Sequence, residues 1–148
     1  MKVSFVCYAH PEPQGSTKAV VPPGWTRAVI TSDNAALKAY RHVVALAAVV
    51  AMREAGLAMI PAAVPVRLTA RFYLAKPPSV PKKRWAPVVK PDLDKLLRAT
   101  FDALAGIVYE RDQQITSARA DKLYGLPERV EIEVVVLEEE KILLGKEG

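Results

Sequence analysis

Residues 90–115 read KPDLDKLLRATFDALAGIVYERDQQI, and this stretch decides the expected fold. Pro91 and Asp92 are typical of the start of a helix, and Gly106 is typical of its end. After a charged turn, residues 114–123 predict a strand. The helix is expected to bury one stripe of residues at helical spacing: Leu93, Leu96, Leu97, Thr100, Phe101 and Leu104.

Outward from this stretch, alternating apolar and polar residues predict strands at 2–8, 66–74 and 130–136. Residues 9–31 have the composition of a long loop, and a helix is expected over 32–55. That helix is expected to bury a second stripe: Leu37, Tyr40, Val44, Ala47 and Ala51.

The resulting order is β-α-β-α-β-β-β, in which residues 107–109 are the first of the last three strands. It predicts an α/β (α+β) fold with one mixed β-sheet and two main helices. No internal repeat or wide linker divides the chain, so we expect one compact domain over 1–148. The charged residues 138–148 are expected to form a frayed tail.

The composition excludes several classes of protein. The single cysteine excludes an internal disulfide and a cysteine-rich metal site, which fits the reducing cytoplasm. The longest uncharged apolar run, residues 43–52, is too short to span a bilayer, and residues 1–8 lack the cleavage site of a signal peptide. We therefore expect a cytoplasmic protein with no membrane partner.

The net charge of +5 divides unevenly along the chain. Residues 67–90 contain basic residues and no acidic ones, whereas most of the charged residues in 128–148 are acidic. Within the basic region, residues 76–91 (the basic arm) combine five prolines with five cations and Trp85, which predicts an exposed loop that contacts phosphates. The candidate nucleic-acid contacts are Lys18, Lys76, Lys82, Lys83, Arg84, Trp85 and Lys90. Lys38 and Arg41 are further candidates, for which a plain solvent-exposed surface and a surface that faces nucleic acid are both open interpretations.

Asp92 and Asp94 directly follow the basic arm, and Asp112 lies in the turn after the helix. One interpretation is structural: Asp92 caps the helix and Asp94 interacts favourably with the helix dipole. The other is chemical, because two or three carboxylates beside a positive groove suit metal-assisted phosphodiester hydrolysis. Asp102 follows Arg98 by four residues, and an ion pair between these two side chains is expected.

The motifs D-L-D at 92–94, F-D-A-L-A-G at 101–106 and Y-E-R-D-Q-Q-I at 109–115 resemble the signature of the RusA-type Holliday junction resolvases. The resemblance implies a small, homodimeric, Mg²⁺-dependent endodeoxyribonuclease of phages and prophage-bearing bacteria, with Mn²⁺ as a substitute metal and no organic cofactor. Its substrate is a four-way junction, which it resolves by paired symmetric nicks during DNA recombination and repair.

The resemblance places the catalytic and metal-binding aspartates of that family on Asp92, Asp94 and Asp112. Arg98 stands where the family has its catalytic lysine, and Lys95 is a second candidate for that ammonium group. Two alternatives stay open at this point. One is a non-catalytic or weakly catalytic DNA-binding phage accessory protein with the same fold, and the other is a nuclease for other nucleic-acid structures.

Overall fold

The computed structural model describes residues 1–15, 18–21, 23–24, 26, 29–31 and 35–139. Its centre is a four-stranded sheet in the order β1-β6-β4-β5. The strands β4 and β5 are parallel and the other neighbours are antiparallel, so the sheet is mixed, as expected. The strand bounds are Lys2–Cys7 for β1, Val66–Leu74 for β4, Ile115–Tyr124 for β5 and Arg129–Val136 for β6.

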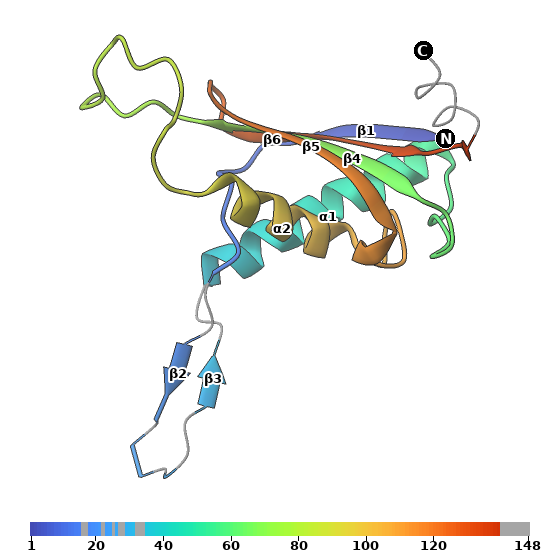
Figure 1. Ribbon diagram of the computed structural model, residues 1–148, viewed down its shortest axis with the longest axis horizontal. Coiled ribbons are helices and arrows are strands. Elements are labelled where there is room, and N and C mark those ends of the chain that lie inside the picture. Colours follow the sequence, from blue (N-terminus) through green and yellow to red (C-terminus); the bar gives the residue numbers. More distant parts are fainter. Residues whose placement is uncertain (16–17, 22, 25, 27–28, 32–34, 140–148) are drawn as a thin grey trace.

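Two helices, α1 (Ala35–Ala55) and α2 (Leu93–Leu104), cover one face of this sheet (Figure 1). The predicted fold class and the order of the main strands and helices are therefore confirmed. The expected inward residues of β4 are all buried, because the alternating pattern directs every second side chain toward the helices. These inward residues are Leu68, Ala70, Phe72 and Leu74.

The buried stripe of α1 differs from the expected one in its second half. Leu37, Tyr40 and Val44 are buried as expected, but the stripe continues through Ala48 and Met52. The continued spacing of four residues carries the stripe around the helix, which leaves part of an apolar surface outside the core. By length and composition alone α1 could cross a membrane, a property it shares with core helices of water-soluble proteins.

The expected loop at 9–31 contains a short antiparallel hairpin of β2 (Lys18–Val20) and β3 (Val29–Thr31). Strands this short carry no readable alternation in sequence. Residues 107–109 form no strand of the sheet; Tyr109 makes isolated bridges to Ile60 and Ala105 instead. Residues 140–148, most of the expected tail, lie outside the described residues.

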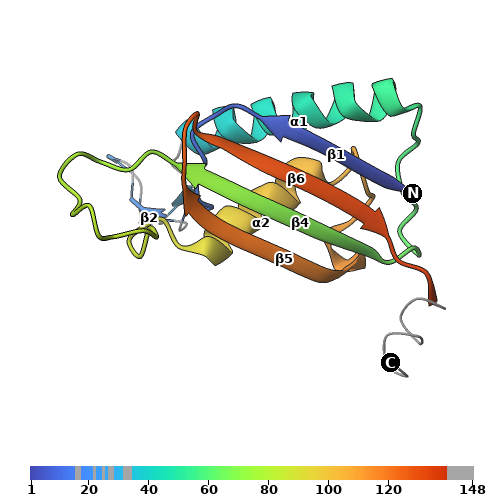
Figure 2. The same cartoon turned by 90° about the horizontal axis from the view of Figure 1, so that it is seen from above.

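The parallel pair β4–β5 requires a crossover connection, which the basic arm and α2 provide. The arm leaves β4 at its end, beyond the sheet, and α2 then runs back beneath the strands (Figure 2). The start of α2 therefore lies near the end of β4. The end of α2 and a single 3₁₀ turn, η1 (Asp112–Gln114), lie near the start of β5. This crossover sets the positions of the candidate catalytic and metal-binding residues and of the basic arm.

Candidate functional site

Asp92 and Asp94 lie at the start of α2, and both side chains are exposed to solvent. The backbone carbonyl of Asp92 accepts the first helical hydrogen bond, from Leu96 N–H, but the Asp92 side chain makes no capping bond. Its carboxylate is 60% exposed and lies 3.9 Å from Lys95 Nζ. Asp94 is also exposed. The capping interpretation thus holds for the backbone of Asp92 and not for its carboxylate.

Asp112 lies at the other end of α2, with its carboxyl group within hydrogen-bonding reach of that of Asp102. Asp112 is exposed, yet partial desolvation of its carboxyl group raises its pKa, and the hydrogen bond and the negative charge of Asp102 raise it further. Two carboxyl groups this close need a proton or a cation between them, because two bare carboxylates repel each other. Burial, together with the charges of Asp112 and Asp102, also raises the pKa of Tyr109, whose hydroxyl donates to Phe101 O at 2.8 Å.

The expected ion pair between Arg98 and Asp102 is not formed. Asp102 pairs with Arg41 of α1 instead, at 3.7 Å from Nη1 to Oδ2, since the packing of α1 beside α2 brings that guanidinium close. Arg98 is exposed and has no ion-pair partner among the described residues. Because Asp94, Arg98 and Asp102 are spaced by four, they share one face of α2 at roughly 6 Å intervals. We call the aspartates Asp94, Asp102 and Asp112, together with Arg98 that lies among them, the acidic row.

The donor set of the acidic row suits a hard cation, although its carboxylates do not form one cage. In the part of the chain that the structure describes, no three carboxylate, imidazole or thiol side chains lie close enough to hold a metal ion. Asp94 and Asp102 are separated by about 12 Å along the helix axis, eight residues at roughly 1.5 Å each. Mg²⁺ takes one or two protein carboxylates and completes its shell with water and phosphate oxygens, and the Asp102–Asp112 pair meets that requirement.

Gln114 positions η1, a role that sequence reasoning missed. Its buried side chain donates from Nε2 to Pro61 O and Val64 O, both at 2.9 Å, and its Oε1 accepts Arg111 N–H at 2.9 Å. These bonds fasten the Asp112 turn to the loop that follows α1. The D-x-Q motif contained the signal, but the partners of Gln114 lie some 50 residues away in sequence.

The basic arm presents most of its expected contacts to solvent. Trp85 is 85% exposed, and Lys82, Lys83 and Lys90 are exposed as well. Lys76 is exposed too, but its side chain lies over the Tyr124 ring and donates to Lys82 O at 3.1 Å, so it helps to close the arm.

The other expected nucleic-acid contacts have different surroundings. Arg84 is half-buried and lines a small cavity of the arm with Trp85. Lys38 is exposed on α1, and Arg41 forms an ion pair with Asp102. The side chain of Lys18 lies outside the described part of the chain.

Lys122 of β5 joins the end of the arm to the sheet, a contact that no local sequence pattern predicts. Its Nζ donates to Val89 O at 2.6 Å and to Pro91 O at 2.8 Å. Both carbonyls lie within the three residues before Asp92, so Lys122 fixes the chain where the arm enters α2.

A cavity of about 350 Å³ lies at the same place. It brings the exposed His10, from the loop after β1, next to the start of α2, although the two segments are some 80 residues apart. Its lining residues are His10, Pro11, Pro13, Lys90, Pro91, Asp92 and Lys95.

Comparison with known proteins agrees with these observations. A family model described as "Endodeoxyribonuclease RusA" matches residues 11–135. The uncharacterized protein YqaN of Bacillus subtilis (strain 168) is 29% identical over 140 residues, which cover 88% of this chain and 93% of that protein. The matched region contains both helices, the basic arm and the whole acidic row.

Proposed function

The chain belongs to the RusA family of endodeoxyribonucleases, and on that premise we propose that it resolves four-way DNA junctions by metal-dependent hydrolysis. It makes paired symmetric nicks during DNA recombination and repair, in the cytoplasm of a bacterium that carries a phage or prophage. The observation that carries this proposal is the acidic row of α2 and η1, which continues from the basic arm.

In this proposal Mg²⁺, with Mn²⁺ as a substitute, is bound at the two ends of α2: by Asp92 and Asp94 at its start, and by Asp112 at its end. The support is the close approach of Asp112 to Asp102, since a divalent cation satisfies two neighbouring carboxylates better than a shared proton does. When bound, the cation supplies Lewis-acid stabilisation of the negative charge that develops on the scissile phosphate. Asp102 then acts as a positioning residue for Asp112, and Arg41 fixes Asp102 from the side of α1.

Arg98 and Lys95 provide the positive charge that faces the substrate. Arg98 is exposed between Asp94 and Asp102, where its guanidinium can hold two oxygens of one phosphate. A guanidinium keeps its proton at any physiological pH, so Arg98 orients and stabilises and does not act as the proton donor. Lys95 has a transferable proton and lies 3.9 Å from Asp92 at the start of the helix.

The basic arm binds the DNA backbone next to this row. Its lysines supply phosphate contacts, and Trp85, with 85% of its surface exposed, offers a ring on which an unpaired base stacks at the branch point. The arm thereby gathers a polyanion around carboxylates that would otherwise repel it.

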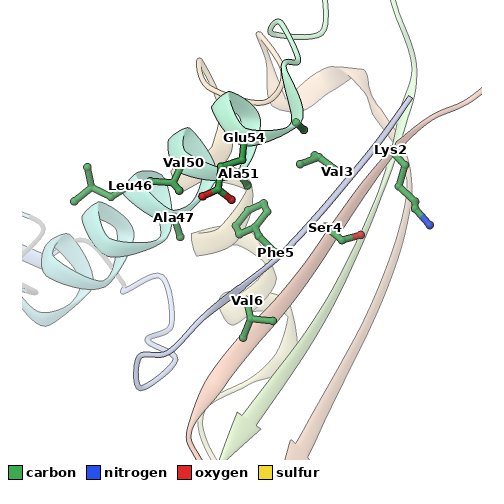
Figure 3. A pocket seen from close by; sticks show the side chains of 11 residues that line it. Lys2, Val3, Ser4, Phe5, Val6, Leu46, Ala47, Val50, Ala51 and Glu54 are labelled. Atoms are coloured by element: carbon green, nitrogen blue, oxygen red, sulfur yellow. The ribbon is translucent and has the colours of Figure 1, made fainter.

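The active form is a homodimer, because a junction is cut at two symmetric points. A groove between the edge strand β1 and α1 supports the proposed dimer. It has a volume of about 710 Å³ and is lined mostly by apolar side chains (Figure 3). Phe5 points from β1 toward α1 in this groove, while Leu46 and Val50 of α1 remain about half exposed. An edge strand beside apolar side chains is typical of a surface that pairs with its own copy.

A nicking assay on a synthetic four-way junction tests the proposal. Asp94→Asn is expected to abolish cleavage in Mg²⁺ and to leave junction binding intact or tighter, because a negative charge near the phosphate is removed. Asp121→Asn, which changes an exposed aspartate on β5 outside the acidic row, is the matched control and is expected to cleave like the wild type. Wild-type cleavage by the Asp94 variant would overturn the assignment, as would full wild-type activity in EDTA.

Arg98 at the position of the family lysine favours one alternative, a junction-binding accessory protein that does not cut. The same assay separates the two functions, since the accessory protein would bind the junction and leave it whole in both Mg²⁺ and Mn²⁺. Competition with linear duplex and RNA separates a junction-specific enzyme from a nuclease of broader substrate range.

A further inference from the structure

The cavity at the start of α2 contains more cationic than anionic side chains. Lys90 and Lys95 face it together with His10, and the carboxylate it contains, Asp92, already lies beside Lys95. Two ammonium groups therefore outnumber one carboxylate even when the imidazole is neutral. A cavity of about 350 Å³ with this charge suits a small anion that carries several acceptor oxygens.

His10 is held in a fixed orientation by a residue 118 positions away. Its Nδ1 lies 2.8 Å from Oε2 of Glu128, which also accepts the backbone N–H of Ala75 at 3.1 Å. Burial alone would raise the pKa of Glu128, but the hydrogen bonds from Ala75 and His10 lower it below its usual value. Glu128 is thus a carboxylate that anchors His10 by one ring nitrogen and leaves Nε2 without a partner among the described residues.

The walls of the cavity are stiff. Pro11, Pro13 and Pro91 have restricted backbones, and the N–H of Gln14 donates to Lys95 O at 3.0 Å, which ties the loop after β1 to the first turn of α2. The loop is therefore fastened at both ends, at Glu128 and at Lys95. A preformed cavity of this kind binds its ligand with little loss of conformational entropy.

We propose that this cavity binds one phosphate group of the nucleic-acid backbone, with His10, Lys90 and Lys95 as its ligands. The inference rests on the proposed function, because it takes the substrate to be a nucleic acid. A phosphate at Nε2 and a carboxylate at Nδ1 together require the imidazolium form, in which both ring nitrogens donate. His10 is then a substrate-positioning contact beside Asp92 and outside the basic arm.

The chain contains two histidines, which makes a direct test possible. Ring signals of His10 and of the exposed His42 on α1 are followed by NMR in EDTA while a thymidine tetranucleotide is added. We expect the His10 signals to shift and those of His42 to stay. Unchanged His10 signals while amide signals of the basic arm shift would overturn the proposal. A response to inorganic phosphate without any response to the tetranucleotide would also overturn it.

A second measurement uses His10→Gln, which keeps a polar side chain and removes the charge, with His42→Gln as the matched control. The slope of log affinity against log salt is negative, and loss of one phosphate contact makes it less steep by about 0.9. Equal slopes for the wild type and the His10 variant would contradict the proposal. A further outcome is that the slope differs between the wild type and the His10 variant although the wild type does not cleave the junction. That result would support phosphate binding in the cavity and contradict the proposed nuclease function, so the failures of the two proposals are distinguishable.

Discussion

Replacing Gln114 with methionine tests how the turn that carries Asp112 is held. The substitution keeps the length and nearly the volume of the side chain, so it opens no large cavity. It removes all three side-chain hydrogen bonds, to Pro61 O, Val64 O and Arg111 N–H. Since Gln114 is only 4% exposed, water does not readily replace them.

The expected cost follows from the number of bonds. Each hydrogen bond of this kind contributes about 0.5–1.5 kcal/mol, so three of them predict a loss of about 3 kcal/mol in the free energy of unfolding. With a urea dependence of about 2 kcal/mol per molar, typical of small proteins, the unfolding midpoint falls by about 1.5 M. The slope of the transition stays unchanged, because the surface exposed on unfolding hardly changes.

The neighbouring Gln113 supplies the matched control, since its side chain is exposed to solvent. Urea unfolding followed by circular dichroism compares Gln113→Met with Gln114→Met, and the exposed variant is expected within about 0.5 kcal/mol of the wild type. Equal midpoints for the two variants would refute the reasoning that Gln114 fastens the turn. Cleavage by the Gln114 variant, assayed where it is still folded, is expected to fall because Asp112 loses its fixed position beside Asp102.

Three further changes test other parts of the site. Because the pKa of Asp112 is raised above its unfolded value of 3.8, the pair contributes stability at acidic pH and loses it as the pH rises through the folded pKa. Asp102→Asn is therefore expected to gain stability over the wild type as the pH rises from about 4 to 7, and urea midpoints that differ equally at both pH values would contradict this. Arg98→Lys is expected to preserve or raise the cleavage rate, and a large loss in single-turnover assays would show that the guanidinium itself is required. Lys122→Met is expected to weaken junction binding about threefold to tenfold, because the end of the basic arm loses its two bonds to β5; unchanged affinity by fluorescence anisotropy would refute this.

The parts of the fold that depend on local patterns were predictable. The alternation in β4 identifies its buried face, because strand periodicity acts over a few residues. The expected stripe of α2 is only half right: Leu96, Thr100 and Leu104 are buried, but Leu93, Leu97 and Phe101 stay partly exposed. Ala99 and Ala103 are buried in their place, because the packing against α1 and the sheet turns the buried face toward these small residues. The hairpin β2–β3 was not predictable, since three paired residues give no pattern. The drift of the α1 stripe to Ala48 and Met52 depends on how that helix packs on the sheet.

The contacts of the site were less accessible to sequence reasoning. The helical spacing of Arg98 and Asp102 favoured an ion pair, but tertiary packing offered Asp102 the guanidinium of Arg41 instead. The same packing brought Asp112 to Asp102, a pairing of like charges that no local rule predicts. The pairing of His10 with Glu128 joins residues 118 positions apart, so no local pattern predicts it.

The insertion of the basic arm into a crossover connection has a consequence for how this chain can diverge. The arm leaves one strand and returns to a helix, and both junctions belong to the folded core. Changing the length of such a loop costs little, about 0.6 kcal/mol for each doubling, and it leaves the register of β4 and β5 untouched. Mutation can therefore lengthen, shorten or recharge the arm while the fold stays the same. Swapping arms between related chains offers a direct route to altered DNA recognition.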